Sequence, residues 1–303
     1  MASRDVATGM IFLSQTVLGT LGNFSLLYHY LFLNCTGCRL RSTHLILEHL
    51  AVANSLVLLS KGVPQTMAAF GLHDFLNDIG CKLVFYAHRV GRGVSIGSTC
   101  LLSVFQALTI SLGNSRWAQL KAKAPKHTGS IICSCWILQM LVNVIFLMYV
   151  SGKRERNITR PKDLGFCAAL GKNNEITLSL FAALLSFPDV SCLGVMIWSS
   201  GSMVFILHRH KQRVQHIHRN SLSPRFNPEV RATQRILILL STFVTLYTLS
   251  STCEVCLALF NRPSWLLVNI STLVAPCFPT VSPFLLSHDI KVFRLCILKW
   301  QRF

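Results

Sequence analysis

Ionisable side chains lie inside stretches of sequence that are otherwise apolar. One such stretch runs from Cys81 to Ser111, CKLVFYAHRVGRGVSIGSTCLLSVFQALTIS, and carries His88, Arg89 and Arg92. Arg89 and Arg92 are three residues apart, so a helix places them on one face. A cation in the hydrocarbon of a bilayer costs about 3 kcal/mol or more unless it reaches a polar interior or the interface. We therefore expect this face to point into a bundle of helices.

Three other apolar runs contain Lys61, Asp189 and Glu254. Counted inward from the expected outer helix ends, at about 1.5 Å per residue, Lys61 and Arg89 lie about 12 Å deep. Glu254 lies about 10 Å deep and Asp189 deeper still. These depths predict an outward-facing pocket with the following residues: Lys61, Tyr86, His88, Arg89, Arg92, Phe187, Asp189 and Glu254. Its net positive charge favours a neutral or anionic ligand. An alternative remains open, in which Arg89 pairs with Glu254 or Asp189 only to fix helix packing.

Other patterns resemble chemical sites only superficially. The G-x-S-x-G pattern of Gly93 to Gly97 marks a hydrolase nucleophile only at a strand-to-helix turn, and here it lies inside an expected helix. We expect these glycines to serve close helix packing instead. Cys35 and Cys38 have metal-ligand spacing without a clear second pair, and Cys253-Glu254-Val255-Cys256 lies within an apolar run. The sequence therefore predicts neither an enzyme nor a metal or cofactor site.

The composition is that of a membrane protein. Hydrophobic residues make up 51% of the 303 residues and charged residues only 13%, which is too apolar for a soluble domain of this length. The formal net charge of +18 lies in short segments between apolar runs rather than on one patch, so we expect no nucleic-acid partner.

The apolar runs predict an all-α membrane protein, a bundle of seven transmembrane helices within residues 1–286. The runs long enough to span lie at about Thr8 to Leu33, His44 to Ala69, Cys81 to Leu112, Thr128 to Tyr149, Ile176 to Leu207, Arg235 to Phe260 and Ser264 to Leu286. Gly and Pro residues punctuate the breaks between them, Pro125 among these.

The distribution of Lys and Arg predicts the orientation. With the N-terminus outside, the inner segments hold 17 of the 29 Lys and Arg residues and the outer segments 8, which agrees with the positive-inside rule. Six of those 8 outer cations lie after the fourth run, which argues weakly against this orientation. The same loop contains the glycosylation acceptor Asn157-Ile158-Thr159, which requires the lumenal side. It also holds Cys167, a candidate partner for Cys81 at the outer end of the third run.

The C-terminal tail, residues 287–303, is too short and too charged to cross. On a helical wheel its apolar residues share one side and its cations the other, which predicts a cytoplasmic amphipathic helix on the inner leaflet. Palmitoylation of Cys296 and an unmodified thiol both remain open. The basic segment from His208 to Arg235 is expected to be a flexible loop that docks a cytoplasmic partner, although a purely topogenic role also explains its charge.

Several long strings resemble the vomeronasal type-1 receptors, a family of pheromone receptors that couple to G proteins. The strings are the Cys81 to Ser111 stretch, KGVPQTMAAFG after the second run, HRHKQRVQHIHR in the third inner loop and CFPTVSPFLL in the seventh run. The resemblance implies a multi-pass receptor of the plasma membrane that binds small volatile or steroid-like molecules and activates a heterotrimeric Gi or Go type G protein. It also implies that Cys81 pairs with Cys167 and that Asn157 carries a glycan.

The resemblance suggests where the G protein docks, and it limits what is borrowed from rhodopsin-like receptors. The residues expected to contact the G protein are Gln106, Arg116, Arg209, Lys211, Arg213 and Arg231. Asn23, Trp136 and Pro283 resemble retained helix landmarks, whereas Asn54 replaces the usual acid and Phe105-Gln106-Ala107 replaces the acidic-Arg-aromatic triplet. The usual ionic-lock account of activation is therefore not transferable.

Three other classes of protein share some of these features. A transporter would show two related halves, which this chain lacks. A bitter-taste or other chemosensory receptor has the same architecture but matches the third and seventh strings less well. A receptor relic that no longer signals looks the same in sequence.

Overall fold

The computed structural model is helical over nearly all of the residues that it describes, which are 3–35, 42–72, 75–110, 115–144, 147, 150–151, 162–163, 168–169, 175–217, 228–259 and 265–286. The helices are α1 (Ser3–Cys35), α2 (Ser42–Val57), the π-helix η1 (Leu58–Gly62), α3 (Val63–Ala69), α4 (Asp78–Ile110), α5 (Ser115–Asn143), α6 (Glu175–Ile217), α7 (Pro228–Leu259) and α8 (Trp265–Val274). A further helical stretch, 277–286, follows α8 after a turn. Over the residues described, each of the seven apolar runs is thus mainly helical, as predicted.

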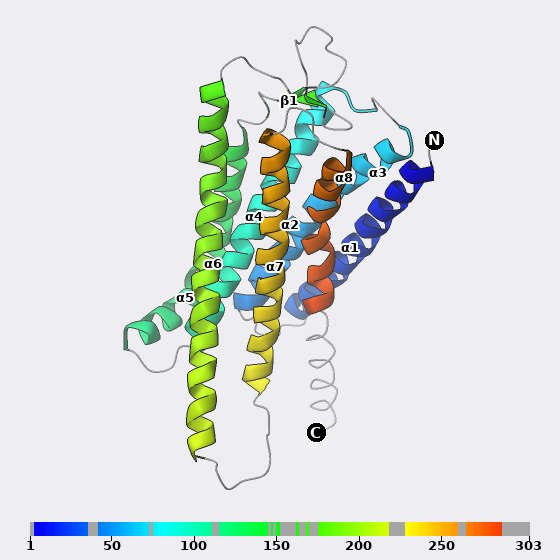
Figure 1. The fold of residues 1–303 in the computed structure, drawn as a ribbon. Coiled ribbons are helices and arrows are strands. Elements are labelled where there is room, and N and C mark those ends of the chain that lie inside the picture. The colour runs from blue at the N-terminus through cyan, green and yellow to red at the C-terminus, as the bar shows by residue number, and fades with distance from the viewer. Residues whose placement is uncertain are drawn as a thin grey trace.

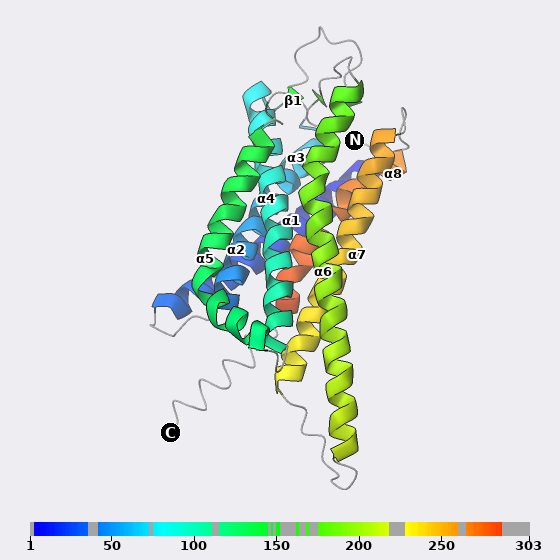
Figure 2. The ribbon, with the colours of Figure 1, turned by 90° about the vertical axis from the view of Figure 1, so that its left-hand side faces the viewer.

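The helices form an elongated bundle in which successive long helices run in alternating directions (Figures 1 and 2). Within the described part of the chain, five helices are long and apolar enough to cross a membrane: Val6–Phe32, Ser42–Ala69, Asp78–Ile110, Phe187–Arg209 and Leu267–Leu286. A shorter apolar helix covers Leu237–Cys253. Large apolar side chains such as Leu21, Tyr28 and Phe32 are exposed on the bundle. This is the surface that a helical membrane protein presents to lipid.

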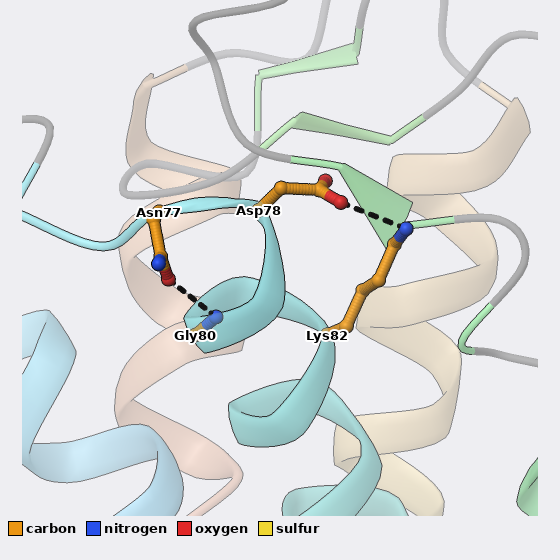
Figure 3. Close-up of polar contacts among 4 residues, drawn as sticks. All are labelled: Asn77, Asp78, Gly80 and Lys82. Atoms are coloured by element: carbon orange, nitrogen blue, oxygen red, sulfur yellow. Dashed lines mark hydrogen bonds and ion pairs between the residues drawn. The ribbon is translucent and has the colours of Figure 1, made fainter.

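The third apolar run begins three residues earlier than its first apolar residues suggest. Asn77 precedes α4, and its side-chain oxygen accepts a hydrogen bond of 2.8 Å from the backbone N–H of Gly80 (Figure 3). Such an N-cap contributes about 1 kcal/mol to helix stability. One turn further, Lys82 and Asp78 form an ion pair of 2.8 Å. Together these contacts fix where the helix that carries His88 and Arg92 starts.

Two predicted loops are partly helical. α6 continues to Ile217 and α7 begins at Pro228, so the expected flexible loop from His208 to Arg235 was wrong at both of its ends. The added turns of α6 are rich in Lys, Arg and Gln, which favour helix, and these turns contain no Gly or Pro. Pro228 is suited to the first position of a helix because its missing N–H is not needed there. α5 likewise runs through Pro125, and its first part is bent relative to the rest (Figure 2).

The chain segment that connects α5 to α6 contains a small sheet, which lies at the end of the bundle where α1 begins (Figure 1). Its strands are β1 (Val150–Ser151), β2 (Lys162–Asp163) and β3 (Ala168–Ala169), which are antiparallel in the order β1-β3-β2. This sheet is a small addition to the predicted helical bundle. Strands of two residues are too short to show an alternating pattern, so the sequence had no signal for them.

α4 lies at the centre of the packing, with α2, α5 and α6 around it. A Cβ added at Gly93 would overlap the side chain of Gln139, and one at Gly97 would lie 2.5 Å from the sulfur of Cys135. Both neighbours belong to α5. The glycines of the G-x-S-x-G pattern therefore allow α4 and α5 to approach closely, as predicted, and the pattern is mid-helix rather than at a strand-to-helix turn.

Candidate functional site

A small cavity lies among α2, α4, α7 and α8. Its volume is about 40 Å³, which has room for no more than a few water molecules at about 10–15 Å³ each. It is lined by Val57, His88, Arg92, Ser95, Ile96, Phe243, Leu246, Tyr247, Ser250, Val274, Ala275, Phe278 and Pro279. Most of this lining is apolar, and its polar groups come from α4 and α7.

His88 contributes a buried imidazole to the cavity. Only 9% of the residue is exposed, and its Nδ1 has no hydrogen-bond partner. The ring also hydrogen-bonds to the backbone of Val57, the residue before η1. The π-helical turn η1 directly follows Val57 and precedes Pro64, whose missing N–H deprives the carbonyl of Ser60 of its usual helical partner. His88 is therefore held from one side and open to the cavity on the other.

Arg92 lies one helical turn below His88 and crosses to α7. Its guanidinium carbon is 4.8 Å from the centre of the Tyr247 ring, a cation–π contact. Its Nη2 donates a hydrogen bond of 3.2 Å to the hydroxyl of Ser251. The Tyr247 hydroxyl in turn donates to the carboxylate of Asp189 across 2.7 Å. Asp189 of α6 is thus linked to Arg92 through Tyr247 rather than lining the cavity itself.

The structure separates the predicted pocket residues into two groups by helix face. His88 and Arg92 line the cavity, and Lys61 and Arg89 lie close enough to interact electrostatically with His88. The Tyr86 hydroxyl instead donates to the carbonyl of Met140 across 3.0 Å. Arg89 Nε donates to Asn143 Oδ1 across 3.4 Å. Tyr86 and Arg89 are three residues apart and share the face towards α5, whereas His88 and Arg92 share another face.

Two further predicted pocket residues are Phe187 and Glu254. Phe187 is 71% exposed on α6, so it faces outward from the bundle. The side chain of Glu254 lies outside the described part of the structure. A ligand-binding role for any of these residues stays a prediction.

Sequence reasoning missed the wall contributed by α7 and α8. Phe243, Tyr247 and Ser250 recur at the helical spacing of four and three residues. This spacing is the signal in the sequence that places them on one face of a helix. The wall from α8 exists because Pro276 interrupts the helix: proline cannot donate a backbone hydrogen bond, and its ring clashes with the carbonyl four residues earlier. The turn after Val274 follows from this, and it brings residues 274–279 to the cavity.

A buried polar network continues from the cavity towards α1 and α2. Ser95 donates to Asn54 Oδ1 across 2.7 Å, and the Asn54 amide donates to Ser282 across 2.9 Å. Asn23 of α1 donates to the carbonyl of Pro279 across 2.8 Å. Ser95 and Pro279 also line the cavity. A displacement of either residue would therefore alter a hydrogen bond of Asn54 or Asn23.

The predicted residues at the two ends of the bundle are only partly described. Cys81 is fully buried and disulfide-bonded. Gln106 is half-buried near the end of α4 and Arg209 is exposed on α6. Four positions lie outside the described residues or lack a described side chain at the inner end: Arg116, Lys211, Arg213 and Arg231. Asn157, Cys167 and Cys296 lie outside the described residues.

Residues 6–298 match the sequence profile of the vomeronasal organ pheromone receptor family. The chain belongs to this family. It is 65% identical to human (Homo sapiens) vomeronasal type-1 receptor 4 over 304 residues, which cover 100% of both chains. It is also similar to human vomeronasal type-1 receptor 3, with 57% identity over 97% of this chain and 95% of that one. Olfactory receptor class A-like protein 1 of Danio rerio is 31% identical over 97% and 93% of the two chains.

These matches confirm the family resemblance that the sequence indicated. The protein is a helical membrane receptor of a chemosensory family. In this vomeronasal receptor the cavity, the helix break at Pro276 and the asparagine network all lie on the inward faces of the bundle, as ligand sites between helices do.

Proposed function

We propose that this receptor detects a small volatile or steroid-like molecule from outside the cell in the cavity between α4, α7 and α8, and activates a Gi or Go type G protein from the plasma membrane. The observation that carries the proposal is the lining of that cavity. The unpartnered Nδ1 of His88 and the side chain of Arg92 belong to a lining that is mostly apolar. An apolar site with a few convergent polar groups suits a mainly apolar ligand with one polar group.

The charge of the site narrows the ligand class. Lys61, Arg89 and Arg92 surround His88 with positive charge, so a bound molecule that accepts hydrogen bonds, neutral or anionic, is favoured over a cation. The cavity is too small for such a molecule at about 40 Å³. Binding must therefore separate the helices around it, and this movement is the proposed signal.

The topology that the function requires has seven spans with the N-terminus outside. The seven helical runs and their alternating directions support it. In this topology Asn157 carries a glycan, and Cys81 pairs with Cys167. Eight described cysteines are free: Cys35, Cys100, Cys133, Cys135, Cys192, Cys253, Cys256 and Cys277. Besides Cys81, this leaves Cys38, Cys167 and Cys296, and of these three only Cys167 lies on the outer side in the proposed topology.

The inner end of the bundle is the proposed docking surface for the G protein. The residues assigned to it are Gln106, Arg116, Arg209, Lys211, Arg213 and Arg231. The helical extension of α6 to Ile217 supports this assignment, because it holds Arg209, Lys211 and Arg213 on a regular helix beyond the apolar span. The amphipathic tail 287–303, with or without a lipid on Cys296, would lie on the inner leaflet beside this surface.

A matched pair of arginine variants tests the proposal. The receptor is expressed in cells with a Gi-coupled reporter and challenged with a panel of odorants and steroids, and surface display is measured with an N-terminal epitope tag. Arg92→Met removes the cationic group from the cavity lining, whereas Arg89→Met makes the same change on the face towards α5. We expect Arg92→Met to lose at least tenfold in ligand sensitivity at normal surface display. Arg89→Met removes a nearby charge but no group of the cavity lining, and it should lose much less.

Two results would contradict the proposal. If Arg92→Met responds to the active ligands as the unmodified receptor does, the cavity is not the ligand site. If the response persists when Gi and Go are blocked by pertussis toxin, the assignment of the G protein is wrong while the ligand site stands.

A further inference from the structure

A tyrosine of α7 reaches an acid of α6 where these two helices lie side by side (Figures 1 and 2). The hydroxyl of Tyr247 donates a hydrogen bond of 2.7 Å to the carboxylate of Asp189. Both residues are half-buried, and both belong to apolar stretches of their helices. A carboxylate at membrane depth is costly unless a polar partner satisfies it, so this bond ties α6 to α7.

The same tyrosine is joined to the ligand cavity through Arg92 of α4. The guanidinium carbon of Arg92 lies 4.8 Å from the centre of the Tyr247 ring, and its Nη2 donates to Ser251, also of α7, across 3.2 Å. Arg92 and Asp189 both interact electrostatically with the Tyr247 hydroxyl. A cation beside a phenol makes its O–H a better donor, because neighbouring polar groups polarise one another. Arg92, Tyr247 and Asp189 thus form one chain of contacts, which we call the latch.

The latch differs from apolar packing in what controls its strength. Well-packed hydrophobic residues hold helices together as firmly as a buried polar pair, and often more firmly. Adhesion of α6 to α7 therefore does not require a tyrosine and an acid. What the polar pair adds is dependence on one charge, since withdrawal of Arg92 weakens the bond between Tyr247 and Asp189.

α6 has a weakened backbone next to the latch. Pro188 directly precedes Asp189 inside this helix. A proline within a helix removes one backbone hydrogen bond, and its ring clashes with the carbonyl four residues earlier. Helices bend readily at such positions, so release of Asp189 frees α6 at a point where it can move.

We propose that the latch keeps the unliganded receptor inactive and that the ligand opens it by drawing the Arg92 guanidinium away from Tyr247. This inference rests on the proposed function, in which the ligand contacts Arg92 and separates the helices around the cavity. A hydrogen-bond acceptor on the ligand competes with Tyr247 and Ser251 for Arg92. Asp189 does not line the cavity, and it is a positioning residue that acts through Tyr247.

Two natural cysteines report the state of the latch without ligand or G protein. Cys192 lies one turn after Asp189 in α6 and packs against the core, and Cys253 is buried in α7. Both are free thiols, as is Cys133, which is exposed on α5 and serves as the internal reference. The full-length receptor is purified into lipid nanodiscs and treated with N-ethylmaleimide, and mass spectrometry gives the alkylation rate of each cysteine. The rate at a shielded thiol follows the fraction of molecules in which the helices have separated.

Tyr247→Phe removes the hydroxyl and keeps the ring under Arg92. We expect the alkylation rates of Cys192 and Cys253 to rise about fivefold, the factor that corresponds to one lost hydrogen bond of about 1 kcal/mol. The rate of Cys133 should not change.

Further variants provide the controls. Thr248→Val also removes a hydroxyl from α7, but this hydroxyl donates to the carbonyl of Val244 in its own helix across 2.7 Å, so both rates should stay as in the unmodified receptor. Arg92→Met should raise both rates, because the phenol loses the nearby charge. Asp189→Asn keeps an acceptor and should raise them less than Tyr247→Phe does. It replaces Tyr247→Phe should that variant lose its cooperative melting transition.

A second arm separates a latch from a bond that only stabilises the fold. In cells with a Gi-coupled reporter, Tyr247→Phe should raise the basal signal per displayed receptor about fivefold as well. Loss of a merely structural bond would lower surface display and leave the basal signal per displayed receptor unchanged.

Two results would overturn the proposal. One is equal alkylation of Tyr247→Phe and Thr248→Val. The other is an unchanged basal signal per displayed Tyr247→Phe receptor in cells where the unmodified receptor does respond to an odorant. If the unmodified receptor responds to no odorant at all, the proposed function fails while the alkylation rates still decide whether the latch exists.

Discussion

The side-chain amide of Asn54 donates a hydrogen bond of 2.9 Å to the hydroxyl of Ser282, and each of these residues is only 1% exposed. The bond joins α2 to the helical stretch 277–286, and Ser95 adds α4 through the amide oxygen of Asn54. Three helices therefore meet on one uncharged side chain. Buried polar groups of this kind stabilise one arrangement only while every member is satisfied.

Replacing Asn54 by Leu removes both hydrogen bonds. The Ser95 hydroxyl then loses its acceptor, and the Ser282 hydroxyl keeps only the long bond of 3.5 Å to the carbonyl of Pro279. We expect the free energy of unfolding to fall by about 1–3 kcal/mol, measured as a lower melting temperature of the detergent-solubilised receptor. Asn54→Asp is the matched control because it keeps the shape and, as the neutral acid, one donor and one acceptor. A leucine variant that melts at the same temperature as the unmodified receptor would show that the network contributes nothing to stability.

Asn23 and Pro283 form a second testable pair. Pro283 has no N–H, so the carbonyl of Pro279 lacks its usual helical partner, and Asn23 supplies the donor across 2.8 Å. We expect Asn23→Leu to lower the free energy of unfolding by about 1–3 kcal/mol, because the buried carbonyl is then left with only the long hydrogen bond of 3.5 Å from the Ser282 hydroxyl. Pro283→Ala returns an N–H to position 283, and it should therefore rescue much of this loss.

The measurement is a double-mutant cycle of melting temperatures for Asn23→Leu, Pro283→Ala and the combined variant. A coupling free energy of at least about 0.5 kcal/mol is expected for residues that share one partner. Simple addition of the two single effects would mean that Asn23 acts elsewhere.

The hydroxyl of Tyr247 is predicted to hold α6 against α7. Tyr247→Phe keeps the ring under Arg92 but removes the hydrogen bond of 2.7 Å to Asp189. We expect a loss of about 1 kcal/mol, below the full value for a hydrogen bond to a charged group because Asp189 is partly exposed. Asp189→Ala should cost about the same and add nothing to Tyr247→Phe in the double variant, while Asp189→Asn keeps an acceptor and should cost less. Melting curves that show fully additive losses would refute the link.

The disulfide assignment predicts identical phenotypes for two cysteine variants. Cys81→Ser and Cys167→Ser should each lower stability by about 2–4 kcal/mol, and the double variant should be no worse than either. Surface display and melting temperature are the readouts, with Cys133→Ser as a free-thiol control. Alkylation with and without reductant, followed by mass spectrometry, identifies the paired cysteines directly. Recovery of Cys81 joined to any other cysteine would contradict the assignment.

The helices were predictable and their ends less so. Long apolar runs such as Cys81 to Leu112 fold as helices because the bilayer requires every backbone group to be paired within its own segment. The polar turns of α6 from His208 to Ile217 follow from helix propensity rather than from hydropathy, and a hydropathy pattern does not register them. The two-residue strands β1–β3 depend on pairing between distant residues, which no local pattern encodes.

The direction in which the site residues point was not predictable from the sequence. Counting along the helices gave Lys61 and Arg89 a similar expected depth, and it placed His88, Arg89 and Arg92 on one helix, which is α4. Successive residues of a helix point about 100° apart, so depth alone did not show that Arg89 turns towards Asn143 while Arg92 turns towards Tyr247. Direction depends on which helices surround α4, and this information belongs to the assembled bundle.

The small volume of the cavity has a consequence for the proposed detection of a ligand. If the ligand binds there as proposed, the helices around the cavity must separate first, and only the fraction of receptors in which they have separated can bind it. Apparent sensitivity then equals intrinsic affinity scaled by that fraction. Substitutions at the Asn54 or Asn23 contacts lie outside the proposed cavity, and we still expect them to change the ligand concentration at which the receptor responds.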